Sequence, residues 1–272
     1  MPASRDRQDA YLPACVFGVM AMGSGKQMKK IRLDQVLVDR ALYPSREQAQ
    51  RAVMAGEVRI GEQVAKKPSL LIDPDARIAT AGSPRFVGRG GFKLEGALDS
   101  FEIDVRDQIA VDIGASTGGF TDCLLQRGAR KVYAIDVGYG QLAWRIRIDP
   151  RVTVFEKTNA RTITPSLINE FANICVIDVS FISLTLILPN AFQLVNASGI
   201  VLALIKPQFE LERAEVGRGG IVRDRSLHEK AKRKIASFIE AGGNEVVGLS
   251  PSAITGTDGN QEFFVCARKQ LV

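Results

Sequence analysis

Apolar residues in the middle of the chain occur in short runs that alternate with segments of helical spacing. The runs 109–113 and 131–135 each predict a buried strand, and the segment 120–127 between them has its apolar residues on one side of a helix. A glycine-rich turn joins the first strand to this helix, and Gly128 ends the helix. Strand, glycine turn, helix and strand form the opening half of a doubly wound, nucleotide-binding type of fold.

The same alternation continues toward the end of the chain and predicts a Rossmann-like α/β domain with a seven-stranded sheet. A helix beginning with 92–98 precedes the first strand. The later strands are predicted at 152–155, 174–177 and 200–205, the later helices at 165–171, 184–194 and 227–241, and a closing antiparallel pair at 245–248 and 262–267.

A separate, smaller α+β module is predicted from residue 29 to about 80. Apolar positions from Ile31 fit one face of a first helix that ends near Leu42. Ser45 is placed to cap a second helix, and Gly56 to end it. Residues 58–64 then form a hairpin around a Gly-Glu turn.

The glycine turn of the larger domain departs from the dinucleotide fingerprint. That fingerprint requires glycine at the first, third and sixth positions, which here are Gly114, Ser116 and Gly119. Asp112 just before the turn would repel a pyrophosphate and would suit a ligand that carries positive charge. S-adenosylmethionine has a sulfonium and an amino group and no phosphate, and Asp136 after the second strand could accept its ribose hydroxyls. A nucleotide, or no ligand, remains the alternative.

Positive charge is concentrated in the small module. Lys26 to Lys93 contains 14 Lys or Arg against 7 Asp or Glu, whereas the remainder to the C-terminus has 20 against 21, and the whole chain carries +6. A basic surface of this kind is the electrostatic footprint of a phosphate-backbone binder. Nucleic acid is therefore the favoured partner, and a solvated basic face without a partner is the alternative.

Charged residues directly follow two of the predicted strands. Asp178 comes after the strand 174–177, and Lys206 after the strand 200–205. In open α/β sheets the ligand crevice lies beyond the carboxyl ends of the strands, so both side chains are expected at one site. Buried charges are costly unless they are paired, which favours a mutual pair.

Other kinds of site find little support in the composition. The four cysteines are far apart and contain no C-x-x-C pair, which fits a reducing compartment and predicts no metal site and no disulfide scaffold. His228 is the single histidine, which leaves little for a Ser-His-Asp or His-metal site. The mildly apolar stretch 12–22 is interrupted by Pro13 and Gly18, so residues 1–28 are predicted to be a disordered extension and no membrane segment is expected.

Several motifs, in order, resemble one known family. The stretch beginning R-L-D-Q-V-L-V-D-R at Arg32, with S-R-E-Q-A-Q-R-A-V from Ser45, resembles an S4 RNA-binding module. G-R-G-G-F-K-L-E-G-A-L from Gly88 and D-I-G-A-S-T-G-G-F-T-D from Asp112 follow it. Together they resemble the TlyA family, in which an S4 domain precedes an FtsJ-like ribosomal RNA 2′-O-methyltransferase.

This resemblance implies the domain bounds and the site. It predicts an S4 domain at 29–83, a linker at 84–91 and a methyltransferase domain at 92–272. The implied catalytic residues are Lys93, Asp178, Lys206 and Glu262. Of these, the positions at the strand ends indicate only Asp178 and Lys206. The implied binding residues for S-adenosylmethionine, with Asn159 at the adenine, are Asp112, Gly114, Ala115, Ser116, Thr117, Gly118, Gly119, Phe120, Asp136, Asn159 and Asp178. The RNA-binding residues predicted on the basic surface and linker are Arg32, Arg46, Arg51, Arg59, Lys66, Lys67, Arg85 and Arg89.

The expected function is therefore 2′-O-methylation of ribose, in a cytidine of 16S or 23S ribosomal RNA or of both. Lys206 is expected either to accept the hydroxyl proton or to remain charged and stabilise the developing oxyanion. The expected partners are ribosomal RNA or ribosomal subunits, and neither a metal nor a membrane is expected. The protein is expected to be a monomer in the cytoplasm. The alternatives are a non-catalytic ribosome-assembly factor and, because family members carry a haemolysin label, a membrane-active protein.

Overall fold

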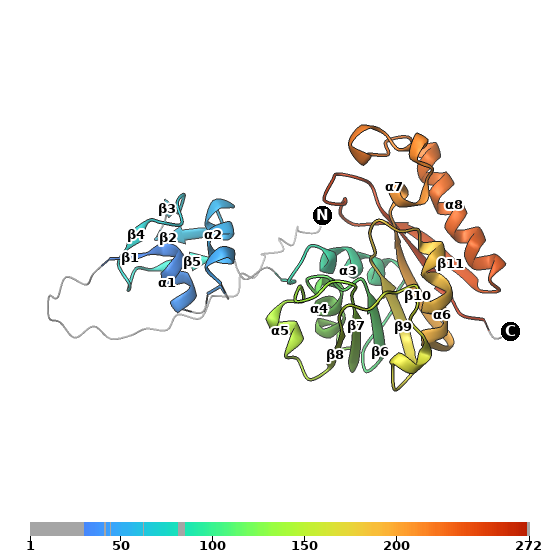
Figure 1. Cartoon of the computed structure of the whole chain (residues 1–272). Helices are drawn as coiled ribbons and strands as arrows, with labels where there is room; N and C mark the ends of the chain where they lie inside the picture. The colour runs from blue at the N-terminus through green and yellow to red at the C-terminus, as the bar shows by residue number, and fades with distance from the viewer. Residues whose placement is uncertain (1–29, 41, 44, 62, 81–84, 271–272) are drawn as a thin grey trace, which may run out of the picture. The chain divides into compact units, whose positions relative to one another are not determined.

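The structure is a computed structural model, and it describes residues 30–40, 42–43, 45–61, 63–80 and 85–270 (Figure 1). The chain divides into two units, residues 1–83 and 84–272. The predicted extension, residues 1–28, lies outside the described residues. Each unit is described separately below.

The first unit packs two helices against short strands around a small apolar core. Leu33 and Leu37 from the first helix and Val53 from the second are fully or almost fully buried in it. Ser45 caps the second helix as predicted, since its hydroxyl accepts a hydrogen bond from the Gln48 backbone N–H. The elements are β1 (Ile31–Arg32) paired with β4 (Leu71–Ile72), the three-stranded sheet of β3 (Gln63–Val64), β2 (Val58–Ile60) and β5 (Ile78–Thr80), and the helices α1 (Leu33–Asp39) and α2 (Arg46–Met54).

A seven-stranded sheet forms the centre of the second unit, as the alternation predicted. Neighbouring strands are parallel except at β12, which pairs antiparallel with β10 and with β11. The strand order reverses between β6 and β9, and this reversal is the switch point at which such sheets bind ligands. In spatial order the strands are β11 (Glu245–Pro251), β12 (Phe263–Arg268), β10 (Val195–Ile205), β9 (Ala172–Ile177), β6 (Ile109–Ile113), β7 (Lys131–Ile135) and β8 (Val152–Phe155).

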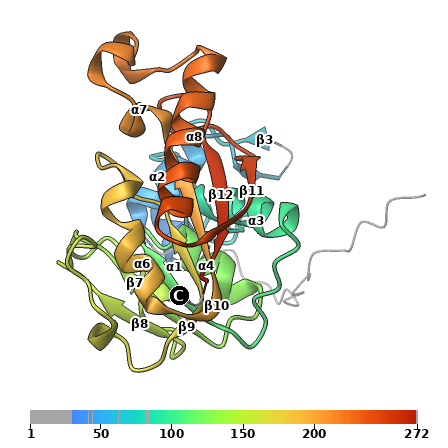
Figure 2. The same ribbon diagram turned by 90° about the vertical axis from the view of Figure 1, so that its right-hand side faces the viewer.

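Helices cover both faces of this sheet (Figures 1 and 2). Side chains from α6 (Leu188–Leu194) and α8 (Arg225–Ala241) share one apolar core with Val111 and Ile113 of β6. Those of α3 (Gly90–Ser100) and α4 (Gly119–Gln126) share the other core, together with Ile146 of α5 (Trp144–Arg147). Successive residues of a strand face opposite sides, which is why β6 places Val111 and Ile113 in one core and Asp112 on the other face, toward α4.

Four element predictions need correction. The first helix, predicted from Ile31 to near Leu42, is α1 (Leu33–Asp39), and Ile31 belongs to β1. The helix predicted at 165–171 is only a 3₁₀ turn, Pro165–Leu167, because Ile168 has extended backbone and β9 begins at Ala172. The helix predicted at 184–194 is a 3₁₀ turn, Leu184–Leu186, followed by α6. The last two residues of the predicted linker 84–91 are helical, since α3 begins at Gly90. The remaining short elements are α7 (Pro207–Glu210) and the 3₁₀ turns Arg213–Glu215 and Arg218–Gly220.

Candidate active site

The glycine turn after β6 lies directly against the segment that follows β9. Gly114 has a φ of +87°, and a Cβ atom on it would come within 2.3 Å of the Asp178 carbonyl oxygen. No other residue type fits this backbone and this approach. The Asp178 backbone N–H also donates to the carbonyl of Ile113. The end of β6 and the end of β9 thus form one edge of the site.

Lys206 and Asp178 form an ion pair at this edge. The Lys206 ammonium lies 2.6 Å from Asp178 Oδ1 and donates a hydrogen bond of 2.8 Å to the Ser180 hydroxyl. Both charged side chains are largely buried, at 10% and 20% exposure. Lys206 is the residue immediately before α7, directly after β10. The predicted meeting of these two strand-end charges is therefore confirmed in the geometry.

Lys93 and Glu262 form a second ion pair, which is deeper. The Lys93 ammonium donates to Glu262 Oε2 at 2.5 Å, and the two side chains are 10% and 3% exposed. Lys93 belongs to the first turns of α3, whereas Glu262 directly precedes β12. A buried ion pair requires close geometry to offset the loss of hydration, and this pair has it.

One cavity of about 310 Å³ brings these four residues together with the glycine turn. Phe181 and Phe209 lie at the same cavity, as do the loop residues Thr255 to Asp258. Gln208 also lines it, and the side-chain oxygen of Gln208 is buried without a hydrogen-bond partner among the described residues. The predicted residues that line this cavity are Arg89, Lys93, Gly114, Ala115, Ser116, Thr117, Gly119, Phe120, Asp178, Lys206 and Glu262.

A smaller cavity lies beside Asp136, at the end of β7. The Asp136 carboxylate accepts hydrogen bonds from the backbone N–H of Ser116 at 2.7 Å and of Gly138 at 2.6 Å. Ala115 and Ser116 line both cavities, so the two adjoin along the glycine turn. Gln141 and Glu156, which the sequence did not single out, also line the smaller one.

Asp112 lies beneath the turn and is completely buried. The Thr121 hydroxyl donates to its Oδ2 at 2.6 Å, while Oδ1 has no hydrogen-bond partner among the described residues. Burial raises the pKa of Asp112 to about 7, and the nearby carboxylates of Asp178 and Asp136 act in the same direction, although the Thr121 hydrogen bond opposes them. A cation that binds close to this carboxyl group stabilises its ionised form.

Two of the predicted cofactor residues occupy other roles in the geometry. Gly118, with a φ of +97°, forms the left-handed entry to α4. Asn159 is exposed, and its side-chain oxygen accepts the backbone N–H of Arg161 as in an Asx turn. Neither of these residues, nor the buried Asp112, lines the two cavities described here.

Phe181 is a feature of the site that the sequence reading passed over. It has a left-handed backbone, with φ of +64°, although it is not glycine, and its side chain is 90% exposed. Its ring centroid lies 5.1 Å from that of Phe209, at an angle of 48°. Strained backbone at a cavity is commonly retained for function. The available signal was an aromatic residue shortly after each strand-end charge, in D-V-S-F and K-P-Q-F.

The predicted RNA-binding residues differ in their surroundings. Arg85 is paired with Glu95, and Arg89 donates to the Thr255 carbonyl at 3.1 Å. Arg51 forms only a long ion pair, 3.9 Å, with Glu47 one helical turn earlier. The exposed residues Arg59, Lys66 and Lys67 lie in the first unit.

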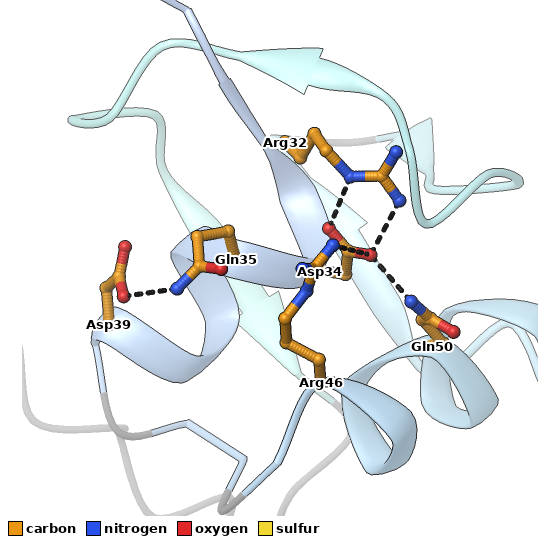
Figure 3. Close-up of polar contacts among 6 residues, drawn as sticks. All are labelled: Arg32, Asp34, Gln35, Asp39, Arg46 and Gln50. Atoms are coloured by element: carbon orange, nitrogen blue, oxygen red, sulfur yellow. Dashed lines mark hydrogen bonds and ion pairs between the residues drawn. The ribbon is translucent and has the colours of Figure 1, made fainter.

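Arg32 and Arg46 of the first unit share one buried partner, Asp34 (Figure 3). Gln50 donates to the same carboxylate. The sequence reading proposed both arginines separately and did not single out Asp34.

The described part of the chain contains no group of three or more His, Cys, Asp or Glu side chains that could hold a metal ion. Among the same residues, no helix combines the length and the apolar character required to cross a bilayer.

Comparisons with known proteins fit this geometry. Residues 86–269 match the family model described as FtsJ-like methyltransferase, and residues 31–78 match the S4 domain. The chain is 51% identical to a putative rRNA methyltransferase, YqxC, of Bacillus subtilis over 87% of its length and 85% of that protein. It is 43% identical to a 16S/23S rRNA (cytidine-2′-O)-methyltransferase, TlyA, of Mycobacterium tuberculosis, over 89% of the chain and 91% of the relative. Among solved structures it resembles a putative hemolysin from Streptococcus thermophilus, with a TM-score of 0.69 and 44% identity, over 89% of this chain and 90% of that one.

Proposed function

Because the chain belongs to the TlyA family, the FtsJ-like methyltransferases that carry an S4 domain, we propose that it methylates ribose 2′-hydroxyls of ribosomal RNA with S-adenosylmethionine. The observation that carries the proposal is the pair of buried ion pairs, Lys206–Asp178 and Lys93–Glu262, at one cavity beside the glycine turn. We propose that the target is a cytidine in 16S or 23S RNA or in both, and that the protein acts in the cytoplasm.

Carboxylate side chains surround the glycine turn at the proposed donor site. When bound there, S-adenosylmethionine supplies a methyl group activated by its sulfonium charge. Asp112 and Asp178 provide negative charge near this cation. Asp112 Oδ1 has no hydrogen-bond partner among the described residues, whereas Asp178 Oδ1 is paired with the Lys206 ammonium at 2.6 Å. Asp136, already held by two backbone N–H groups, lies beside the smaller cavity and accepts ribose hydroxyls. This set of donors and charges fits a sulfonium and an amino group better than a pyrophosphate.

The methyl acceptor is activated by the Lys206–Asp178 pair. As the 2′-oxygen forms its bond to the methyl carbon and the sulfur–carbon bond breaks, the hydroxyl must lose its proton. The Lys206 ammonium, held by Asp178 and Ser180, stabilises the negative charge that develops on this oxygen. The Asp178 carboxylate, beside Lys206, would accept the proton of the 2′-hydroxyl.

The second ion pair, Lys93–Glu262, helps to orient the 2′-hydroxyl toward the methyl group. Lys93 and Glu262 neutralise each other at a fixed separation of 2.5 Å and form one wall of the cavity. A fixed wall holds the hydroxyl in line with the methyl group, and correct alignment contributes several kcal/mol to such transfers.

Phe181 and Phe209 provide a surface for the base of the reacting nucleotide. A nucleotide must leave its stack before its 2′-hydroxyl can enter a cavity in a protein, and an exposed aromatic ring replaces part of the lost stacking. Phe181 is exposed and adjoins the cavity that contains the Lys206–Asp178 pair. The first unit, which contains the S4 domain, binds the phosphate backbone of the RNA through its arginines and lysines.

Transfer of labelled methyl groups to purified 30S and 50S subunits, and to the naked RNAs, tests the proposal. We expect alkali-resistant label at one 2′-O-methylated nucleotide in each RNA that is methylated by the wild-type protein, and a loss on the order of 10²–10³-fold with Lys206→Ala. Lys269→Ala, a lysine change remote from the site, should retain activity. Binding of S-adenosylmethionine without transfer to any subunit or RNA would refute catalysis and favour the assembly-factor alternative.

A further inference from the structure

The first unit contains a buried acid inside the surface that is proposed to bind RNA. We propose that Asp34 is a positioning residue, which holds the guanidinium groups of Arg32 and Arg46 side by side as a preset pair for the RNA backbone. This inference rests on the proposed function, since it requires that the first unit binds RNA.

Asp34 contacts both arginines directly (Figure 3). Arg32 donates to it through two atoms, Nε to Oδ1 at 3.0 Å and Nη2 to Oδ2 at 2.8 Å. Arg46 donates Nη2 to Oδ2 at 3.2 Å, and Gln50 donates Nε2 to the same oxygen at 2.7 Å. The partners come from β1 and α2, so one carboxylate at the start of α1 fixes three side chains from two other elements.

Both guanidinium groups retain most of their donors. Each has five N–H groups, of which Arg32 uses two and Arg46 one in these bonds. The side chains are 45% and 50% exposed, whereas Asp34 is 0% exposed. The acid is therefore shielded from a ligand, while the two cations are partly exposed and have further N–H donors that bond to none of the described residues. Phosphate oxygens are the ligands that such planar, multiple donors match best.

The charge of Asp34 is constant under conditions in which RNA binds. The Arg32 hydrogen bonds, followed by those of Gln50 and Arg46, hold its pKa far below the usual range although burial opposes them. The acid thus lowers the local positive charge by one at all neutral pH values. By charge alone, Asp34 weakens binding of a polyanion, so a benefit to RNA affinity has to come from geometry.

Two interpretations of this cluster predict opposite changes in RNA affinity when Asp34 is replaced. If Asp34 only holds the helices together, its replacement by asparagine adds one net positive charge and RNA binds equally well or more tightly at temperatures where the protein is folded. If Asp34 presets the arginines, the replacement frees two long side chains that must be ordered again on binding. Ordering two long side chains again on binding corresponds to a loss of affinity on the order of tenfold.

The experiment compares Asp34→Asn with Asp39→Asn in the full-length protein. Asp39 is an exposed acid on the same helix, hydrogen-bonded to Gln35 at 2.7 Å, so its replacement makes the same charge change without touching the arginines (Figure 3). Binding to purified ribosomal subunits is measured at several salt concentrations, with thermal unfolding and steady-state methyl transfer in parallel.

We expect Asp34→Asn to raise the Kd and the KM for subunits on the order of tenfold with kcat unchanged, and Asp39→Asn to leave both constants equal or lower. Equal or tighter binding by a folded Asp34→Asn protein would overturn the proposal. Should this variant fail to unfold cooperatively, Gln50→Ala decides, because it removes one bond to Asp34 without any charge change. A loss of at least about twofold supports positioning, and unchanged binding refutes it.

Arg32→Ala and Arg46→Ala separate this inference from the proposed function. If neither weakens subunit binding, the RNA surface itself is wrongly assigned. If both weaken it while Asp34→Asn does not, the surface stands and only the positioning role fails.

Discussion

Asp112 is a buried carboxyl group whose replacement by asparagine should stabilise the fold and weaken donor binding. The side chain is 0% exposed and only one of its oxygens has a hydrogen-bond partner among the described residues. Asparagine has nearly the same shape, cannot ionise, and keeps an oxygen that accepts the Thr121 hydroxyl. The variant therefore isolates the effect of the charge.

The magnitude follows from the raised pKa. Relative to the ordinary value of 3.8, a folded-state pKa of about 7 is a difference of about 3 pH units, or about 4 kcal/mol. Between these two values the folded protein holds a proton that the unfolded chain releases. The free energy of unfolding of the wild type therefore falls as pH rises from about 4 to about 7, and then stays low. Asp112→Asn has no such loss.

The assay is urea or thermal unfolding of the full-length proteins between pH 4 and pH 8, with the transition of the larger unit followed. The two stability curves should diverge by about 4 kcal/mol over this range, or roughly 10 °C in Tm. Burying the unpaired amide N–H₂ costs about 1–3 kcal/mol, so the variant should still be the more stable protein at pH 8.

Asp107→Asn, an exposed acid in the same unit, is the control and should show no such divergence. Parallel curves for Asp112→Asn and wild type would refute the reasoning, because they would mean that the carboxyl group carries no buried charge. Donor binding, measured by calorimetry at pH 8, should change in the opposite direction to stability, since the ionised carboxylate attracts the cationic donor.

Two further predictions concern the acceptor side of the cavity. Lys206→Arg should retain more methyl transfer than Lys206→Ala, because arginine keeps the positive charge beside the 2′-oxygen but cannot accept a proton; equal losses in steady-state assays would instead make Lys206 the base. Phe181→Ala should raise the KM for RNA on the order of tenfold through lost stacking, whereas Phe171→Ala, an exposed phenylalanine at the opposite ends of the strands, should leave it unchanged.

The central strand–turn–helix–strand unit could be predicted closely from the sequence because all of its signals are local. β6 and β7 have the predicted bounds, and α4 differs by one residue at each end. The helix predicted at 165–171 failed for a reason that is not local. Ile168 is drawn into the core beside the start of β9, and this tertiary contact overrides a weak helical pattern.

The rule that ligands bind beyond the carboxyl ends of parallel strands explains which parts of the site could be predicted. It placed Asp178 and Lys206 together from topology alone, since carboxyl ends of parallel strands share one edge. It could not reach Lys93 or Glu262, which lie 169 positions apart. Lys93 lies near the start of a helix, and Glu262 lies just before an antiparallel strand. For those two residues only the family resemblance offered a signal.

Asp34 and Asp112 show that the hydrogen-bond partners of a buried acid, rather than its residue type or its burial, decide whether it is charged. Both carboxyl groups are 0% exposed. Asp34 accepts hydrogen bonds from three side chains, two of them cationic, and is a permanent charge. Asp112 accepts one side-chain hydrogen bond, from a neutral hydroxyl, so its folded form resists ionisation until a cation arrives. The acid that has its cations within the chain organises a surface, and the acid that lacks them is suited to receive one from a ligand.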